Sequence, residues 1–513
     1  MSTAVLSEPA VVVPKRTLGI PNQVLAGLLG IFIAAMMSGL NNRVGSLGLA
    51  DVRGVMGVSL DDASWLQTAY AMGELIAMPF ASWFAITLSV RRFHLSMVFV
   101  CALIAAILPF IQNLDVLIGL RFVQGISSGA LIPILMMAAL KFLPPNIRLH
   151  GLALYAMTAT FAPNLAVWLT GLWTDGLSNW RWLYWQVIPL CGLAGLFVGW
   201  GLPKEGVKYA RFAQGNWLGM FCGVISLLLL TIALDQGVRL DWFNSPLIVV
   251  SLVGGVILFG CYVLTEWHHD APFIKPQLMA RKNLLIGTVL LTFLLVVLMS
   301  GSMLPSNYLA GLQDYRVMQI APIGLLIALP QLVLGSVVAL LLYQKWVDSR
   351  VMLAIGLGII ALACFSGAQL TPQWNRDQFL VAQLLQAIGQ PMAVVSILFL
   401  MTSVLDPSEG PYFSGAINTF RVFGSLIGGA VVGQLLTVRS RFHSDMLLEH
   451  AGLVDGAIPQ ALDASTLGTT VAQQSMVLSV IDAYLVLGVL ALILIPLALM
   501  MTYVPAPDLS KQN

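Results

Sequence analysis

The chain has 513 residues, of which 58% are hydrophobic and only 9% are charged. A soluble globular domain carries about 25% charged residues, because these residues cover its surface in water. The 25 Lys and Arg residues and 23 Asp and Glu residues are too few to cover a particle of this size. Composition therefore excludes a soluble protein and predicts that most of the surface faces lipid.

Apolar runs long enough to cross a hydrocarbon layer of about 30 Å recur along the whole chain, separated by short polar segments. Their hydrophobicity is uniform rather than alternating, which favours helices over the strands of a barrel. The predicted spans are 24–49, 63–88, 95–112, 115–140, 150–172, 183–202, 216–235, 246–266, 283–308, 320–343, 351–369, 378–404, 411–436 and 475–503. We therefore expect an all-α polytopic membrane protein with fourteen transmembrane helices and both termini on one side.

The basic residues predict the orientation. With the N-terminus in the cytoplasm, Lys and Arg residues in the loops favour the inside by roughly two to one, which satisfies the positive-inside rule. This places both termini in the cytoplasm. Only one connection is long: residues 437–474, rich in Ser, Asp, Gln and Thr, are expected as a loop on the outer side. Such a loop is either an ordinary solvated connection or a contact with a periplasmic partner.

Four ionisable residues stand out within the predicted spans, away from the ends of the spans: Arg43, Glu74, Arg121 and Arg421. A charge near the centre of a bilayer costs at least a few kcal/mol, so such residues normally face a cavity or a partner. Glu74 has two interpretations. It can form a salt bridge with Arg43 on the preceding helix, or it can carry a proton for transport. Three Arg residues against one Glu leave the interior positive, which favours anionic or neutral amphipathic cargo over lipophilic cations.

Small residues and prolines indicate close helix packing and hinges. Gly125 and Gly129 lie four residues apart in one span, and Gly424 and Gly428 repeat that spacing near the C-terminus. This spacing lets helix backbones approach closely, either in a static interface or in one that rocks. Pro163 interrupts the fifth span, where a missing hydrogen bond kinks a helix.

Several classes of function are not supported by any motif. There is no Gly-rich Gly-Lys-Ser/Thr loop for phosphate, and the histidines lack the spacing of metal ligands. We therefore expect neither an ATP-driven pump nor an enzyme, and no cofactor, metal site or nucleic-acid partner.

Four short motifs together resemble a known family. They are Trp65-Leu-Gln-Thr-Ala-Tyr in the second span, Arg121-Phe-Val-Gln-Gly-Ile-Ser-Ser-Gly-Ala-Leu-Ile-Pro in the fourth, Leu234-Asp-Gln-Gly after the seventh, and Asn418-Thr-Phe-Arg421 in the thirteenth. Their order and spacing resemble those of the fourteen-span drug:proton antiporters of the major facilitator superfamily, the EmrB/QacA type. The similarity runs over nearly the whole chain.

The resemblance implies a major facilitator fold with two six-helix bundles around a central cavity and two extra helices inserted between them. It also implies export driven by proton entry, with Arg121 taking part in coupling, and in the EmrB-like branch a periplasmic adaptor and an outer-membrane channel. The expected divisions are a tail at 1–21, a first bundle at 22–203, the inserted pair with its linkers at 204–275, a second bundle at 276–503 and a tail at 504–513.

The sequence departs from the family pattern in three places. Where the family has Leu-Asp-x-Thr in the first span, this chain reads Leu40-Asn41-Asn42-Arg43. The loop after the second span keeps Arg91-Arg92 but lacks the usual Gly and Asp. The fifth span has Pro163 and Gly171 but not the usual Gly-Gly pattern. We hypothesise that Glu74 has taken over the task of the missing carboxylate in the first span.

The combined expectation is an inner-membrane exporter, driven by the proton-motive force, for neutral or weakly acidic amphipathic small molecules such as drugs and toxic compounds. Alternatives are a dedicated exporter of a metabolite, such as a siderophore or an aromatic acid, and a non-transporting receptor or scaffold. The residues expected to couple protons are Glu74, Arg121 and Arg43. Those expected to bind substrate are Asn41, Asn42, Arg43, Gln124, Asn418 and Arg421, and those expected to serve packing or movement are Gly125, Gly129, Pro163, Gly171, Gly424 and Gly428.

Overall fold

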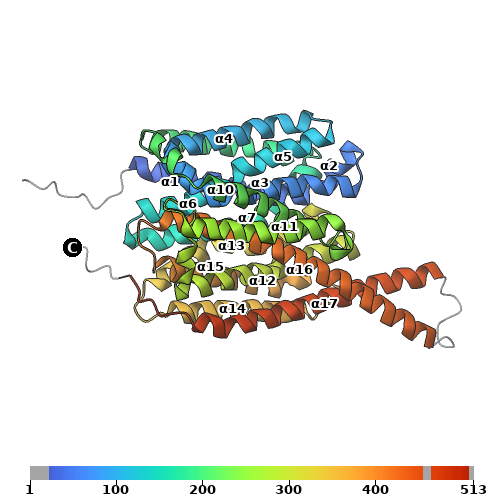
Figure 1. Cartoon of the computed structure of the whole chain (residues 1–513). Coiled ribbons are helices and arrows are strands. Elements are labelled where there is room, and N and C mark those ends of the chain that lie inside the picture. Colours follow the sequence, from blue (N-terminus) through green and yellow to red (C-terminus); the bar gives the residue numbers. More distant parts are fainter. Residues whose placement is uncertain (1–21, 454–463, 508–513) are drawn as a thin grey trace, which may run out of the picture.

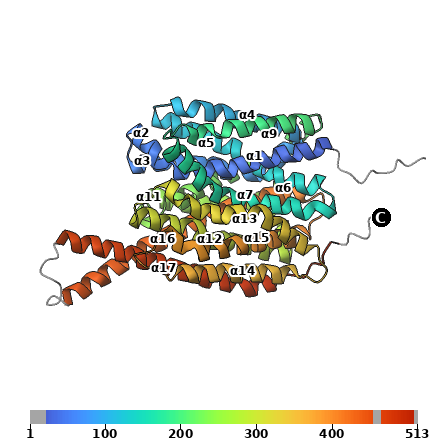
Figure 2. The ribbon, with the colours of Figure 1, turned by 180° about the vertical axis from the view of Figure 1, so that it is seen from behind.

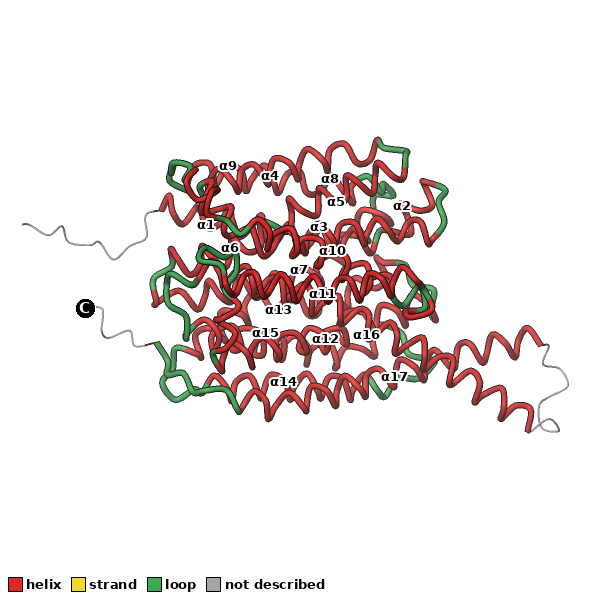
Figure 3. The backbone as a smooth tube through the Cα atoms, in the orientation of Figure 1, coloured by secondary structure: helices red, strands yellow, loops and turns green. Residues whose placement is uncertain are grey.

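The computed structural model describes residues 22–453 and 464–507. Within these residues there are fourteen helices long and apolar enough to cross a membrane, and no strand, as Figure 3 shows. The predicted all-α fold is confirmed. The first six spans are formed by α1 (Asn22–Leu47), α3 (Leu60–Leu88), α4 (Val90–Ile107), α5 (Leu114–Gly129) with α6 (Leu131–Phe142), α7 (Pro145–Gly171), and α8 (Trp182–Trp185) with α9 (Val187–Gly201).

The remaining eight spans follow in the same antiparallel order. They are α10 (Trp217–Gln236), α11 (Pro246–His268), α12 (Lys282–Leu312), α13 (Val317–Leu342), α14 (Ser349–Gly367), α15 (Leu380–Thr402), α16 (Gly410–Leu453) and α17 (Ala464–Leu499). The first helix begins and the last helix ends at the same end of the bundle, which we call the terminal end. The opposite end, from which α16 and α17 project, is called the hairpin end (Figures 1 and 2).

Helix packing separates two groups. In the first group α1 packs against α7 and α9, and α3 against α5. In the second group α14 packs against α15 and α17, and α12 against α16 and α17. The two groups, called the first and second bundles, meet along α7 with α13 and along α3 with α16. Figure 1 shows the first bundle in blue to green above the second in yellow to red.

The pair α10 and α11 joins the two bundles along the sequence. These helices pack on each other, and α10 also packs against α3 of the first bundle and α16 of the second. Near the terminal end an aromatic cluster connects α3 with the segment that follows α11. Phe273 of this segment contacts Trp83 and Phe80 of α3, with ring centroids 4.8 and 5.3 Å apart. The inserted pair therefore covers one seam between the bundles.

Glycine brings α3 and α5 into backbone contact. A Cβ atom at Gly125 would lie 2.2 Å from the carbonyl oxygen of Tyr70, and one at Gly129 would lie 2.5 Å from that of Glu74. On the facing helix, a Cβ at Gly73 would lie 2.1 Å from the oxygen of Phe122. No side chain fits at these positions, so the spacing of small residues sets how closely the two helices approach. This contact fixes Tyr70 and Glu74 against α5.

The other small residues and the proline singled out in the sequence lie at further helix contacts. Gly424 and Gly428 of α16 face α12, where a Cβ would lie 3.1 and 3.2 Å from the Cα atoms of Thr292 and Val296. Gly171 lies against α13 of the other bundle, where a Cβ would be 2.5 Å from the Cα of Met318. Pro163 lies inside α7.

The segment expected as a long loop is largely helical. Helix α16 continues to Leu453 and α17 begins at Ala464, so the two form a hairpin that projects far beyond the bundle (Figure 2); residues 454–463 lie outside the described residues. At its base Arg439 and His443 of α16 both contact Asp482 of α17 at 2.6 Å. The expectation of a loop was wrong because polar composition reflects exposure to solvent, and most polar residues remain compatible with a helix.

Candidate functional site

Arg121 is a buried cation without an anionic partner. Its Nη1 donates to Oε1 of Gln124 at 2.7 Å, and its guanidinium lies 4.3 Å from the ring centre of Tyr70 and 5.6 Å from that of Tyr184. Among the described residues no carboxylate lies within ion-pair distance of it. Helix α1 passes so close that a Cβ at Gly45 would be 2.5 Å from the guanidinium. The cation is thus stabilised by aromatic faces and one amide rather than by an opposite charge.

A chain of hydrogen bonds joins α1, α3 and α5 beside Arg121. Asn41 donates to the hydroxyl of Tyr70 at 3.2 Å, and this hydroxyl donates to Oγ of Ser128 at 2.7 Å. The Oδ1 atom of Asn41 and the Nε2 atom of Gln124 are buried and have no hydrogen-bond partner in the described part of the chain. Because buried polar atoms are normally paired, these two are available to a bound molecule or to water.

Glu74 is held by a neutral amide. Its Oε2 accepts a hydrogen bond from Asn42 of α1, and Oδ1 of Asn42 in turn accepts from Gln67 at 2.9 Å. The carboxylate is almost fully buried. It interacts electrostatically with Arg421 of the second bundle and, more weakly, with Arg121 of the first. A single carboxylate therefore lies in the field of two cations that belong to different bundles.

The structure does not contain the Arg43–Glu74 salt bridge that was one of the two interpretations of the sequence. Across residues 22–453 and 464–507, the side chain of Arg43 makes no hydrogen bond or ion pair, and it is half-buried. Successive helix residues are rotated by about 100°, so Asn42 points towards Glu74 and Arg43 points elsewhere on α1. Arg43 thus lies apart from the contacts made by Glu74 and Arg121.

In the second bundle, Arg421 and Asn418 of α16 are held by α7 of the first bundle. Nη1 of Arg421 donates to the hydroxyl of Thr158, and its guanidinium lies 5.5 Å from the ring centre of Tyr155. The Tyr155 hydroxyl donates to Oδ1 of Asn418 at 2.8 Å. As with Arg121, the described residues place no carboxylate within ion-pair distance of Arg421. Each bundle therefore contributes one buried guanidinium stacked on tyrosine.

The sequence interpretation missed a chain of buried glutamines that continues this site into the second bundle. Gln331 of α13 accepts from Thr160 of α7 and donates to Gln390 of α15 at 3.1 Å. Gln390 donates to Gln386 at 3.2 Å, which donates to Ser300 of α12 at 2.8 Å. The signal was present as Gln residues at helical spacing within apolar spans, because an uncharged amide buried in lipid also needs a partner.

The bundles are also joined by contacts near both ends. At the hairpin end, Nε of Arg316 contacts Asp175 at 2.7 Å and its Nη2 contacts Asp51 at 3.5 Å. At the terminal end, the Ser414 hydroxyl donates to the carbonyl of Pro133 at 2.5 Å. Burial raises the pKa of Asp51, with the positive charge of Arg316 opposing this shift. The site between the bundles thus lies between two sets of contacts, one near each end, that join the bundles.

Comparison with known proteins identifies the family. The Major Facilitator Superfamily profile matches residues 28–429. The chain belongs to this superfamily. The multidrug resistance protein EmrY of Escherichia coli, described as probable, is 26% identical over 425 residues, which are 82% of this chain and 81% of that protein. The fatty acid resistance protein FarB of Neisseria gonorrhoeae is 21% identical over 485 residues, 91% of this chain and 94% of that protein.

A solved structure shares the fold. The crystal structure of the human organic anion transporter MFSD10 aligns with this protein at a TM-score of 0.60 and 12% sequence identity. The alignment covers 93% of this chain and 100% of the MFSD10 chain. Membership of this superfamily makes the protein an integral membrane transporter rather than an enzyme. Several relatives, among them EmrY and the multidrug export protein EmrB of Escherichia coli, are named for multidrug resistance or export, which supports a role in drug efflux.

The facilitator fold gathers most, but not all, of the residues singled out in the sequence. Glu74, Arg121, Asn41, Asn42 and Gln124 lie together on α1, α3 and α5. Asn418 and Arg421 lie on the facing helix α16, within the electrostatic reach of Glu74. The tyrosines that stack on the two arginines were not predicted, because their role depends on contacts between helices far apart in the sequence.

Proposed function

We propose that this protein exports neutral or weakly acidic amphipathic small molecules across the inner membrane in exchange for protons. In this proposal the terminal end faces the cytoplasm, since the loops at that end hold most of the Lys and Arg residues. The two bundles rock about the site between them and expose it to one side of the membrane at a time.

The observation that carries the proposal is the charge balance of the site. Arg121 and Arg421 are buried in different bundles, and their hydrogen-bond partners among the described residues are neutral. Within the same residues, Glu74 is the carboxylate that interacts electrostatically with both. A buried cation without a counter-charge is costly, and an anionic cargo group would supply that charge. A site for lipophilic cations would be expected to show the opposite surplus.

Glu74 is the proposed proton carrier. Its carboxylate is bonded to the Asn42 amide, so its charge is balanced only through space by Arg421 and Arg121. Binding a proton removes that negative charge and changes the electrostatic field that a cargo group meets beside the two arginines. Proton occupancy and cargo occupancy are then linked through one electrostatic balance.

The relatives support the same class of cargo. FarB is named for resistance to fatty acids, which are amphipathic weak acids, and EmrY is named for resistance to multiple drugs. These names support export of toxic amphiphiles more than dedicated export of one metabolite.

We extend the proposal to partners on the outer side of the membrane. The hairpin of α16 and α17 projects well beyond the bundle, and it offers a surface to a periplasmic adaptor that leads to an outer-membrane channel. Shortening the hairpin just beyond the Arg439–Asp482 pair should leave transport in membrane vesicles intact but abolish resistance of whole cells. Equal resistance with and without the projection would contradict an adaptor at this surface.

The function is tested by a susceptibility screen in a host that lacks its own pumps. Cells expressing the protein are compared with empty-vector cells for growth in matched series of acidic, neutral and cationic amphiphiles. We expect protection against acidic and neutral members, abolished by Glu74→Gln at equal expression. Protection confined to lipophilic cations would refute the proposed cargo.

A further inference from the structure

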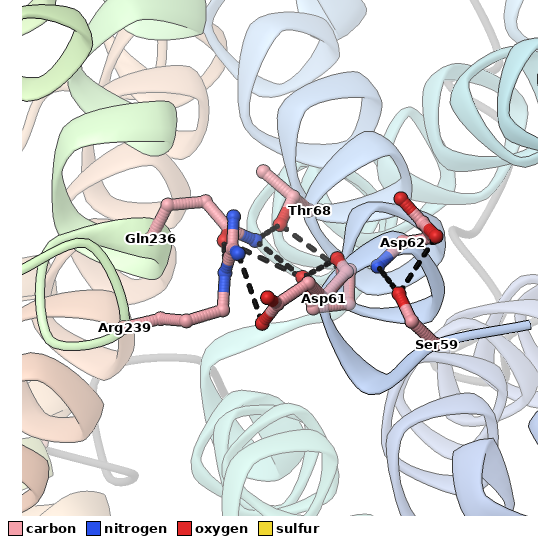
Figure 4. Close-up of polar contacts among 7 residues, drawn as sticks. Ser59, Asp61, Asp62, Thr68, Gln236 and Arg239 are labelled. Atoms are coloured by element: carbon pink, nitrogen blue, oxygen red, sulfur yellow. Dashed lines mark hydrogen bonds and ion pairs between the residues drawn. The ribbon is translucent and has the colours of Figure 1, made fainter.

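Hydrogen bonds and an ion pair connect the end of the first inserted helix, α10, and the turn after it to α3 near the hairpin end (Figure 4). Nε2 of Gln236 donates to the Thr68 hydroxyl at 2.5 Å, and Oε1 of Gln236 accepts from Nε of Arg239 at 2.5 Å. Nη1 of Arg239 also pairs with Asp61 at the start of α3, at 3.1 Å. These contacts tie the end of the inserted pair to the helix that carries Glu74.

Asp235 lies among these contacts and has no cationic partner among the described residues. Its Oδ2 accepts the hydroxyl proton of Thr68 at 2.5 Å. The nearby cation, Arg239, pairs with Asp61 instead, and within the described ranges no Lys, Arg or His lies within ion-pair distance of Asp235. A carboxylate that is half-buried and has only a hydroxyl as its side-chain partner is poorly stabilised as an anion. A proton on Asp235 would relieve that penalty.

The surroundings of Asp235 link it to the proposed coupling site. Thr68 and Glu74 are six residues apart on α3, an axial distance of about 9 Å. Helix α10 also packs against α16, which carries Arg421, so Asp235 lies where both bundles meet the inserted pair. The charged groups on the helices packed against α10 are Asp61, Asp62 and Glu74 on α3, Glu266 on α11, and Arg421, Arg439, Arg441, Asp445 and Glu449 on α16. His268 on α11 and His443 and His450 on α16 can also titrate, and the turn after α10 adds Arg239 and Asp241.

We infer that Asp235 is a second proton-binding residue of the transport cycle, through which the inserted pair is coupled to α3. The carboxylate takes one proton from the solution at one end and releases it at the other as the bundles rock, and no other bond is made or broken. When Asp235 is charged, its carboxylate accepts the hydroxyl proton of Thr68. When it is protonated, the carboxyl group is neutral and gains an O–H donor, so the hydrogen bond with Thr68 becomes weaker or reverses its direction. The inference rests on the proposed proton-driven export.

The test uses the full-length protein in bilayers and compares Asp235→Asn with wild type. Asn keeps the size of the side chain and an oxygen that accepts from Thr68, but it cannot bind a proton. The matched control is Asp241→Asn, on the turn of the same inserted pair, where Asp241 bonds to the exposed Asn244. Glu74→Gln is included so that the two candidate proton sites are separated.

The first readout is infrared difference spectroscopy as pH is varied, which detects the carbonyl stretch of a protonated carboxyl group and does not require transport. We expect one carbonyl band whose intensity changes with pH in wild type, Asp241→Asn and Glu74→Gln. The same band should be absent in Asp235→Asn and should appear at a shifted frequency in Thr68→Val. A spectrum of Asp235→Asn identical to that of wild type would overturn the inference.

The second readout is accumulation of an acidic amphiphile in proteoliposomes under an imposed pH difference of about one unit, at which each coupled proton concentrates cargo about tenfold. We expect accumulation by Asp235→Asn to fall about tenfold, with exchange of cargo in the absence of a gradient preserved. Unchanged accumulation would overturn the inference. Absence of gradient-driven accumulation in wild type, with the infrared band still lost in Asp235→Asn, would instead refute the proposed function and leave the proton site established.

Discussion

Replacement of Arg121 by methionine is expected to weaken binding of acidic cargo selectively. Methionine retains an apolar stem against the Tyr70 ring, 4.3 Å from the present guanidinium, and removes the charge and the hydrogen bond to Gln124. Truncating one partner of a buried charge pair costs about 2–5 kcal/mol. Affinity for an acidic amphiphile should therefore fall by about thirtyfold to several thousandfold. Affinity for a neutral analogue of the same size should change by less than about tenfold, since it loses no ion pair.

The assay is titration of the purified protein in lipid nanodiscs with an acidic amphiphile and its uncharged amide. Arg121→Lys serves as the conservative variant and should lie between wild type and Arg121→Met, because lysine keeps the charge but loses the planar fork and its stacking. Arg53→Met, on the short helix α2 (Leu49–Met56), controls for removal of an arginine outside the site. Equal loss of both ligands, or unchanged binding of the acid, would refute the reasoning.

Three further outcomes are expected. Glu74→Gln should retain exchange of cargo without a gradient and lose gradient-driven uptake in vesicles; full gradient-driven uptake would exclude Glu74 as the proton carrier. Gly129→Val should lower the free energy of unfolding by about 1–3 kcal/mol or more, because its side chain meets the Glu74 carbonyl, whereas Gly119→Ala, with open space, should unfold at the wild-type temperature. Burial raises the pKa of Asp51 in the folded protein, so its charged form is destabilising and the free energy of unfolding should fall as pH rises through the raised pKa. Asp51→Asn should remove this fall, as measured by the thermal unfolding temperature at a series of pH values. Identical pH dependence in the variant and wild type would contradict the role of Asp51.

Most of the fold could be predicted from the sequence because the membrane imposes a simple rule. Every backbone group within the hydrocarbon must be paired inside its own helix, so long apolar runs become spans and their number follows directly. The same rule made Glu74, Arg121 and Arg421 visible, since a charge within an apolar run is rare. The rule fails beyond the membrane, where the polar segment after residue 437 proved helical.

The partners of these residues could not be predicted in the same way. Asn42 rather than Arg43 bonds to Glu74, because the direction of a side chain depends on the rotation of α1, which the nearly uniform hydrophobicity of that span does not reveal. The stacking of Tyr70 on Arg121 and of Tyr155 on Arg421 depends on contacts between helices, and in the second case on packing between the bundles. Short-range patterns carry no information about such contacts.

The central claim, that cargo export is coupled to protons through Glu74, is tested most directly by measuring proton movement when cargo is added. Proteoliposomes containing the protein and a trapped pH indicator receive an acidic amphiphile that does not cross protein-free membranes. We expect a proton flux in the direction opposite to the cargo with wild type and none with Glu74→Gln. Transport of the amphiphile without any proton flux, or an equal flux with Glu74→Gln, would contradict the claim.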